Sequence, residues 1–433
     1  MAKPHAVVVG AGLAGAEAAM QLAKRGIKVT LYEMKPQKFS PAHSNEDFAE
    51  LVCSNSFKAE RTASAAGLLK EEMRYFGSVC LAAADKARVP AGGALAVDRE
   101  VFAKEVTRIV KDEKNIDIVR KEVLSVPCGD TVIIAAGPLM SDALANDISN
   151  KFGNLLSFYD AAAPIVTADS IDYDNSFFQS RYDRGDKSDY VNCPMDKAEY
   201  EKFHEALITA ETAKTNAFDV YEGCMPVEVL ARRGKDSIRY GPLKPVGLTD
   251  PKTGHRPWAN LQLRKENTAG TLYNLVGFQT NLKFSEQKRV FSLIPALKNA
   301  EFARFGVMHR NTFINSPKIL NADLSTKKFP NLYFAGQLTG VEGYMESASS
   351  GIIAGQNVAR KLLKEEPLAL PQFTMMGALL HHILDTKTKD FQPMGAAFGL
   401  LPPLSQVIKN KALRYEALSK RSLSYLNEEM KIQ

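Results

Sequence analysis

The first 33 residues contain the pattern that most restricts how this chain can fold. A Gly-x-Gly-x-x-Gly pattern is formed by Gly10, Gly12 and Gly15. It follows a short β-branched run at 5–9 and precedes a helix-forming stretch at 16–25. Glu33 ends the next apolar strand, 18 residues after the last glycine, close to the expected spacing of about 20. This order of strand, glycine turn, helix and acidic residue predicts a dinucleotide-binding βαβ unit in an α/β fold.

Each part of this pattern has a physical task in binding a dinucleotide. The first glycine allows the tight turn, the second lets the backbone approach a pyrophosphate, and the third lets helix and strand pack closely. The helix N-terminus offers N–H groups to the anion, and Glu33 can accept hydrogen bonds from ribose hydroxyls. The predicted cofactor-binding residues of this unit are Gly10, Ala11, Gly12, Leu13, Ala14, Gly15 and Glu33.

A second glycine-rich segment lies about 300 residues further along the chain. Residues 331–344 read Asn-Leu-Tyr-Phe-Ala-Gly-Gln-Leu-Thr-Gly-Val-Glu-Gly-Tyr, and an apolar strand at 131–135 also ends in a glycine turn. Together with the first unit, these segments resemble the three nucleotide-binding elements of two-dinucleotide-fold flavoproteins, which favours FAD over NAD as the bound cofactor. The predicted cofactor-binding residues of the second segment are Gly336, Gln337, Gly340, Gly343 and Tyr344.

A change in composition along the chain predicts that one domain is interrupted by another. Between 151 and 269 the sequence becomes rich in Tyr, Asp and Asn, with short strand-like pieces broken by Pro and Gly. We therefore expect a Rossmann-like FAD-binding domain at 1–150 and 270–433, interrupted by a smaller inserted α+β domain. Helices are expected over 62–112, broken by a turn at 90–93, over 347–360, and in an amphipathic tail at about 405–429.

Composition excludes several classes of protein. Five cysteines without a Cys-x-x-Cys pair, and only seven histidines, fit neither a disulfide framework nor a structural metal site, so no metal is expected. The longest apolar runs are far shorter than a membrane span, and the N-terminus leads directly into a strand. We therefore expect a cytoplasmic protein without a membrane partner.

Two cysteine-containing segments carry a specific family resemblance. Residues 50–58 read Glu-Leu-Val-Cys-Ser-Asn-Ser-Phe-Lys, and residues 221–228 read Tyr-Glu-Gly-Cys-Met-Pro-Val-Glu. Both are similar to motifs of the bacterial folate- and FAD-dependent tRNA (uracil-5-)-methyltransferases, the TrmFO family. Further similar segments lie at 190–195, 275–281, 306–312 and 391–394. The chain departs from the family pattern at Gly395-Ala-Ala and at 294–298, which bears on substrate detail more than on chemistry.

The resemblance implies an enzyme that forms 5-methyluridine in the T-loop of tRNA. Methylenetetrahydrofolate would donate the carbon, FAD would carry the methylene, and NADH or NADPH would supply electrons. Carbon-5 of uracil is a poor nucleophile until a thiolate adds at carbon-6, and the resemblance assigns that attack to Cys224. Cys53 would remove the carbon-5 proton or protect the flavin adduct, and Tyr344 would neighbour the flavin or folate ring. Structural roles are expected for the remaining cysteines, Cys80, Cys128 and Cys193.

Three alternative functions stay open at this level. The first is the same chemistry on 23S ribosomal RNA, and the second is a noncatalytic tRNA-binding flavoprotein, against which both intact cysteine motifs count. The third is the larger relative that adds carboxymethylaminomethyl groups to wobble uridines and carries an extra C-terminal helical domain. Only 78 residues follow Gly355, which is too few for that domain. The expected partner is the T-arm of tRNA or ribosomal RNA, held by short basic clusters such as 232–239.

Overall fold

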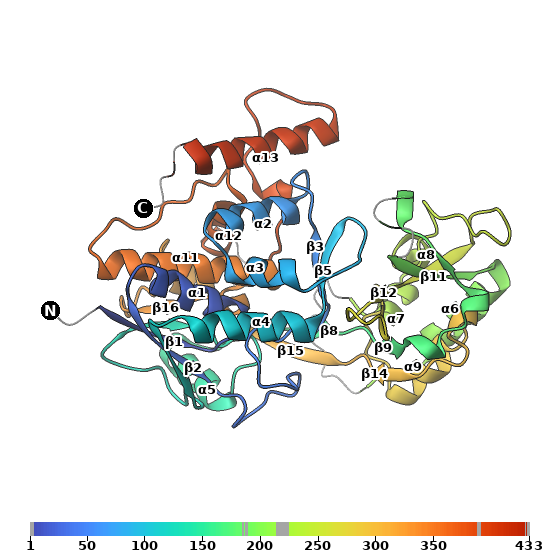
Figure 1. The fold of residues 1–433 in the computed structure, drawn as a ribbon, viewed down its shortest axis with the longest axis horizontal. Coiled ribbons are helices and arrows are strands. Elements are labelled where there is room, and N and C mark those ends of the chain that lie inside the picture. Colours follow the sequence, from blue (N-terminus) through green and yellow to red (C-terminus); the bar gives the residue numbers. More distant parts are fainter. Residues whose placement is uncertain are drawn as a thin grey trace.

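Two large hydrophobic cores divide the described part of the chain into two bodies joined by a two-stranded ribbon (Figure 1). The computed structural model describes residues 4–183, 186, 189–213, 225–387, 391–428 and 430. The first body holds both glycine motifs, and we call it the nucleotide body. The second, built from residues between 165 and 304, is called the inserted body.

A parallel sheet forms the centre of the nucleotide body. Its strand order is β16-β7-β1-β2-β6. The strands are β1 (His5–Val9), β2 (Lys28–Glu33), β6 (Ile116–Arg120), β7 (Thr131–Ile134) and β16 (Leu332–Phe334). Val8 on the central strand is fully buried and aligns with Leu31 on one side and Ile133 on the other. Such continuous apolar strands are typical of a parallel sheet covered on both faces, which confirms the predicted α/β fold.

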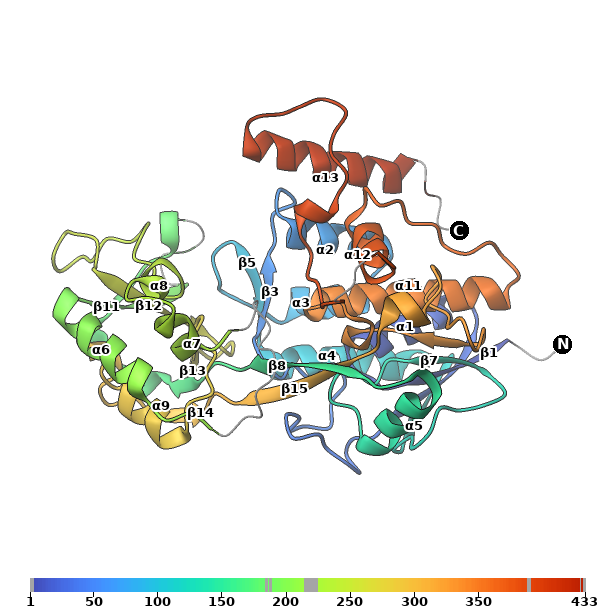
Figure 2. The same ribbon diagram turned by 180° about the vertical axis from the view of Figure 1, so that it is seen from behind.

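Helices α1 (Leu13–Lys24) and α11 (Tyr344–Leu362) pack against each other at very close range. A Cβ atom on Gly351 would lie 2.2 Å from the Ala14 carbonyl oxygen, and one on Gly355 would lie 2.7 Å from that of Ala18. Only glycine permits this approach, which places the two helices that begin at the glycine motifs side by side. In Figures 1 and 2, α5 (Asp142–Phe152) lies on the other side of the sheet.

The predicted helical stretch over 62–112 contains three helices and two strands. The helices are α2 (Ala65–Tyr75), α3 (Val79–Lys86) and α4 (Arg99–Asp112). The strands β4 (Arg88–Val89) and β5 (Ala94–Val97) flank the turn at 90–93 and were not predicted. They form because β5 also pairs with β3 (Ser56–Ala59), a partner that lies far away in the sequence.

The inserted body is built on a sheet of six strands, ordered β10-β11-β12-β13-β9-β14, whose neighbouring strands pair antiparallel. The strands are β9 (Ile165–Thr167), β10 (Phe177–Phe178), β11 (Tyr190–Met195), β12 (Ala259–Lys265), β13 (Leu272–Leu275) and β14 (Phe302–Arg304). Its helices include α6 (Lys197–Thr209), α7 (Val227–Arg232), α8 (Ser237–Tyr240) and α9 (Phe284–Phe291). Alternate residues of β12, such as Leu261 and Leu263, enter the core, whereas Gln262 and Arg264 lie on the opposite face.

This body extends beyond the predicted domain boundary at residue 269. Strands β13 and β14 complete its sheet, and Leu275 and Phe291 belong to its core. The prediction assigned the apolar strands after residue 270 to the nucleotide body. Hydrophobic pattern identifies a buried strand but does not specify the sheet in which it pairs, so the boundary had to come from the tertiary structure.

A ribbon and a C-terminal layer complete the chain. Strands β8 (Leu156–Ala161) and β15 (Met308–Phe313) pair antiparallel and run between the two bodies (Figure 2). After the short α10 (Ser316–Ile319), the chain returns to the nucleotide body and ends in α12 (Met375–Ile383) and α13 (Lys411–Glu428), which pack on α2. Among the described helices, none combines the length and apolar character needed to cross a membrane.

The buried carboxylate of Glu72 fastens this C-terminal layer to α2. Its two oxygens accept the backbone N–H groups of Met375 and Met376, at 2.6 and 2.7 Å, and one also accepts the hydroxyl of Ser422 at 2.6 Å. Burial raises the pKa of Glu72 to about 7. The three hydrogen bonds act in the opposite direction and lower the pKa, because they favour the ionised form. One side chain therefore joins three helices that are far apart in the sequence.

Candidate active site

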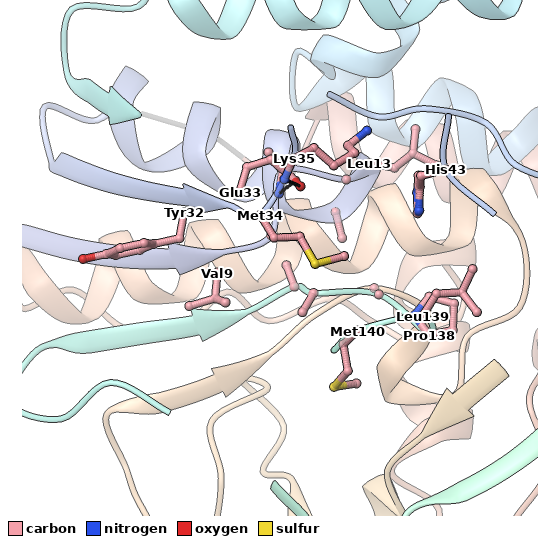
Figure 3. A pocket seen from close by; sticks show the side chains of 18 of the residues that line it. Val9, Leu13, Tyr32, Glu33, Met34, Lys35, His43, Pro138, Leu139 and Met140 are labelled. Carbon is pink, nitrogen blue, oxygen red and sulfur yellow. Dashed lines mark hydrogen bonds between the residues drawn. The ribbon is translucent and has the colours of Figure 1, made fainter. Parts of the chain in front are cut away.

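A groove in the nucleotide body collects both glycine motifs around one space. Its lining includes Gly10, Gly12, Glu33, Gly137, Gly336 and Tyr344. Figure 3 shows Glu33, Lys35 and His43 on one side of this space, and Pro138, Leu139 and Met140 on the other. The turns after β1, β7 and β16 thus meet at the carboxyl ends of neighbouring parallel strands, where open α/β sheets bind their ligands.

The first glycine motif has the close approaches that its pattern predicts. Gly10 has a φ of +98°, and its N–H donates to the Tyr32 carbonyl at 2.8 Å. A Cβ on Gly15 would lie 1.7 Å from the Gly10 carbonyl oxygen, so this position can hold only glycine. A Cβ on Gly12, in contrast, would meet nothing within 4 Å. Gly12 therefore borders open space at the start of α1, whose N-terminus has no side-chain cap.

Glu33 lies at the groove and also organises the motif loop. Its carboxylate accepts the N–H of Ala11 and the N–H of Lys35, each at 3.0 Å, and the residue is 7% exposed. Ala11, Leu13 and Ala14 line the same groove. A ribose placed there would share the carboxylate with two backbone donors that already fix its orientation.

The second motif divides into groove-lining and packing positions. Gly336, Gln337 and Tyr344 line the groove, whereas Gly340 and Gly343 do not. A Cβ on Gly340 would lie 2.4 Å from the ring of Phe391, and one on Gly343 would lie 2.2 Å from a carboxylate oxygen of Glu346. Both glycines have positive φ, so close packing and backbone conformation account for them in this structure.

Sequence reasoning missed the polar groups at one side of the groove. Lys35 donates to the Asp47 carbonyl at 2.5 Å and pairs with Glu50 at 3.2 Å. His43 also lines the groove, and burial together with the charge of Lys35 lowers its pKa. These residues lie in the irregular stretch after β2, where no periodic pattern indicates which side chains turn inward.

Cys53 lies next to the groove through a contact with Tyr344. The Cys53 N–H donates to the Tyr344 hydroxyl oxygen at 2.8 Å, and the tyrosine ring meets Phe57 edge-on at a centroid distance of 6.0 Å. The structure therefore brings together Cys53 and Tyr344, two predicted site residues that are 291 positions apart in the sequence. Burial raises the pKa of Tyr344, so its hydroxyl keeps its proton at neutral pH.

The Cys53 thiol has charged neighbours of both signs. Burial and the charges of Asp160 and Glu342 raise its pKa, while Arg99 and Arg304 lower it. Glu342 is 8% exposed and accepts a hydrogen bond from Gln337 at 2.6 Å. Burial and the charge of Asp160 raise the pKa of Glu342 to about 8. The resting form of Cys53 is thus the thiol, and its ionisation depends on which of these charges prevails.

Cys224 lies outside the described residues, but the C-terminal half of its motif is anchored. The Val227 N–H donates to the Gln279 carbonyl at 2.7 Å. The buried carboxylate of Glu228 accepts the Thr280 hydroxyl at 2.9 Å and the Asn281 N–H at 2.8 Å. Residues 227–228 and 279–281, which belong to two of the family-like segments, are therefore held against each other.

Of the other described cysteines, two are buried in the protein and one is exposed. Cys80 and Cys193 are fully buried, and burial raises the pKa of each thiol. Cys128 is exposed, and its sulfur lies 3.8 Å from the Val126 carbonyl oxygen. None of the three lines the groove that holds the glycine motifs.

Comparison with known proteins identifies the family. The family model described as Glucose inhibited division protein A matches residues 5–366. A relative from Pelotomaculum thermopropionicum, named methylenetetrahydrofolate--tRNA-(uracil-5-)-methyltransferase TrmFO, is 57% identical over 97% of both chains. The chain belongs to the TrmFO family. An equally named relative from Acetivibrio thermocellus is 55% identical, again over 97% of both chains, so the predicted family is confirmed.

The solved structure of Aquifex aeolicus GidA shares the fold of this TrmFO family member. The two superpose with a TM-score of 0.72 at 18% sequence identity, over 99% of this chain and 76% of the GidA chain. A second crystal form gives a TM-score of 0.67 at 17% identity. At this level of identity the likeness concerns the fold alone, and it agrees with the predicted Rossmann-like α/β fold.

Proposed function

We propose that this chain methylates carbon-5 of uracil in tRNA, with methylenetetrahydrofolate as carbon donor and FAD as cofactor. One observation carries the proposal: the groove that holds both nucleotide motifs is bordered by Tyr344, whose hydroxyl is hydrogen-bonded to the Cys53 backbone. A dinucleotide site and a candidate thiol thus adjoin. The relatives that are named for this activity match this chain over 97% of their own length.

The residues of the groove fit FAD. The open space beside Gly12, the uncapped start of α1 and the buried Glu33 match the needs of a pyrophosphate and a ribose. Helix α11 also begins without a side-chain cap. Gly10, Gly12, Glu33, Gly336 and Tyr344 would therefore hold the cofactor.

The two cysteines would divide the chemistry on the base. When bound, FAD supplies a route by which the one-carbon unit of the folate and the electrons of NADH or NADPH reach the uracil. The Cys224 thiolate would form a carbon–sulfur bond at carbon-6, which makes carbon-5 nucleophilic. After carbon-5 has attacked the one-carbon unit, loss of the carbon-5 proton would release that unit from its carrier as an exocyclic methylene. A hydride from the supplied electrons would then convert the methylene to the methyl group and expel the thiolate. Cys53, which shares the site with Tyr344, would take up the carbon-5 proton or protect the reactive cofactor.

The carbon source and the RNA are tested together by isotope labelling. The protein is incubated with reductant, labelled methylenetetrahydrofolate and either tRNA or ribosomal RNA, and the nucleosides are analysed by mass spectrometry. We expect labelled 5-methyluridine in tRNA. Label in ribosomal RNA alone would shift the substrate to the ribosome, and label that enters only from S-adenosylmethionine would refute the folate donor.

The cysteine roles are tested by trapping on 5-fluorouridine RNA. Fluorine at carbon-5 cannot leave as a cation, so attack at carbon-6 leaves a covalent protein–RNA complex. We expect this complex in the wild type and in Cys53→Ala but not in Cys224→Ala, while both variants keep bound FAD. Trapping that depends on Cys53 alone would reverse the two assignments.

Both proposed substrates indicate where the reaction takes place. Transfer RNA and reduced folates are handled in the cytoplasm of bacteria, so we place the reaction there. The choice between NADH and NADPH is tested by comparing the rates at which each reduces the bound flavin, read from its absorbance near 450 nm.

A further inference from the structure

Arginine side chains hold three consecutive backbone carbonyls around Cys53. Arg99 donates from one terminal nitrogen to the Leu51 carbonyl at 2.9 Å and from the other to the Cys53 carbonyl at 2.7 Å. Arg304 donates to the Val52 carbonyl between them at 2.6 Å. Because the loop has no regular secondary structure, these bonds replace those that a strand or a helix would provide.

A third arginine fixes the residues that follow Cys53. Arg264 donates to the Asn55 side-chain oxygen at 2.8 and 3.0 Å and to the Ser54 hydroxyl at 3.1 Å. Asn55 is fully buried and donates to the carbonyls of Val97 and Lys265, each at 3.0 Å. The loop is therefore held continuously from residue 51 to residue 55.

The donors come from both bodies. Arg99 is the first residue of α4 in the nucleotide body, whereas Arg264 on β12 and Arg304 on β14 belong to the inserted body. Glu266, which follows β12, forms an ion pair with Arg99 across the boundary and is 4% exposed. The position of Cys53 thus depends on how the two bodies meet.

Positive charge exceeds negative charge within this arginine cluster. Arg99 pairs with the carboxylate of Glu266. Burial raises the pKa of that carboxylate, and the charges of Arg264 and Arg304, like that of Arg99, lower it. A buried guanidinium without a full counter-charge costs several kcal/mol. Backbone carbonyls offset part of that cost, and an anion formed at Cys53 would offset more.

We propose that Arg99 and Arg304 are positioning residues for Cys53: they fix its loop against Tyr344 and make its thiol easier to ionise than it would be without their charges. The inference rests on the proposed function, in which Cys53 takes part in the reaction. Asp160 on β8 and Glu342 before α11 act in the opposite sense on the same thiol, as does burial. The two arginines provide the opposing positive charge, one from each body.

The test measures Cys53 ionisation directly. Wild type, Arg99→Met, Arg304→Met and Arg99→Lys are alkylated with iodoacetamide between pH 6 and pH 10, and Cys53 is followed by peptide mass spectrometry. Removing either charge should raise the apparent pKa of Cys53 by about one unit, which slows alkylation about tenfold at a fixed pH. Arg99→Lys should keep most of the pH profile, because its charge remains.

The steady-state kinetics separate charge from geometry. A lysine at position 99 offers one ammonium group in place of the planar fork, so it cannot serve both carbonyls and Glu266 together. We expect kcat to fall about tenfold in Arg99→Lys, with the KM for tRNA within about twofold of wild type. The matched control is Arg289→Met on α9, which removes an arginine that pairs only with its helix neighbour Glu286 among the described residues.

Two results would overturn the proposal. In the first, Arg99→Met and Arg304→Met show the alkylation profile and kcat of Arg289→Met. In the second, they lower only the melting temperature, which would make the cluster a structural joint. If Arg99→Met fails to fold, Arg304→Met decides the outcome. The alkylation profile needs no RNA, so a wild type that fails to methylate tRNA would refute the proposed function separately.

Discussion

The nucleotide groove and the Cys53 loop adjoin, yet they are built from different chemistry. The groove is shaped by backbone: glycines bring helices and turns close together, and the start of α1, which has no side-chain cap, borders the space. The Cys53 loop is shaped by side chains, with arginines from two bodies bonded to its carbonyls. The contrast indicates that different properties limit substitution in the two regions. Side-chain size is the limit at the groove, whereas charge and hydrogen bonding are the limit at the loop.

The largest effect is expected at Gly15, where an added Cβ would lie closer to a neighbouring backbone atom than at any other glycine of the two motifs. Gly15→Val would place a side chain within 1.7 Å of the Gly10 carbonyl oxygen, so helix α1 cannot keep its position. We expect a loss of stability of at least about 4 kcal/mol and no bound FAD. Urea unfolding and flavin absorbance measure the two. A stable variant that still binds FAD, and is therefore yellow, would show that the close approach at Gly15 is not needed to form the groove.

A carboxylate that bonds to helix N–H groups should make stability depend on pH. Glu72 has a pKa of about 7 in the folded protein, above its ordinary 4.5, so the folded state holds the proton longer than the unfolded state. Stability is therefore fully present below pH 4.5 and declines as pH rises to about 7, by about 3 kcal/mol in all.

Unfolding by urea at several pH values measures this decline. Glu72→Gln has no proton to lose, so its stability should vary less over the same range. Equal slopes in variant and wild type would assign the pH dependence to other groups, such as Glu342, whose pKa is also raised.

Asn55 tests the joint between the bodies without touching the groove. Asn55→Ala removes two donated bonds and the acceptor for Arg264 from a fully buried side chain. We expect a loss of about 2 kcal/mol in stability, with FAD content unchanged and slower alkylation of Cys53. Loss of FAD in this variant would show that loop and groove are one cooperative unit.

The smallest effect on the fold is expected at Gly12. Gly12→Ala adds a methyl group that meets no protein atom within 4 Å, at a residue with an ordinary φ of −71°. Stability should stay within about 0.5 kcal/mol of wild type. The affinity for FAD, measured by fluorescence titration, should fall, because the methyl group enters the space assigned to the pyrophosphate. Unchanged affinity would place the cofactor elsewhere.

The sequence by itself determined the nucleotide unit and the family. The turn after β1, the helix and Glu33 lie within 33 residues, so their geometry follows from local sterics that glycine spacing reveals. The motif at 331–344 could be recognised from the sequence for the same reason. Within it, Gly340 and Gly343 allow close packing against Phe391 and Glu346.

Only the tertiary structure decided which residues surround Cys53 and where the inserted body ends. Arg99 and Arg304 are 46 and 251 residues away from that cysteine, and no local pattern distinguishes them from other arginines. Strands β13 and β14 resemble buried strands of either sheet until their partners are known. The physical reason is the same in both cases: long-range pairing depends on which surfaces meet after folding, whereas turns and helix starts depend on neighbours along the chain.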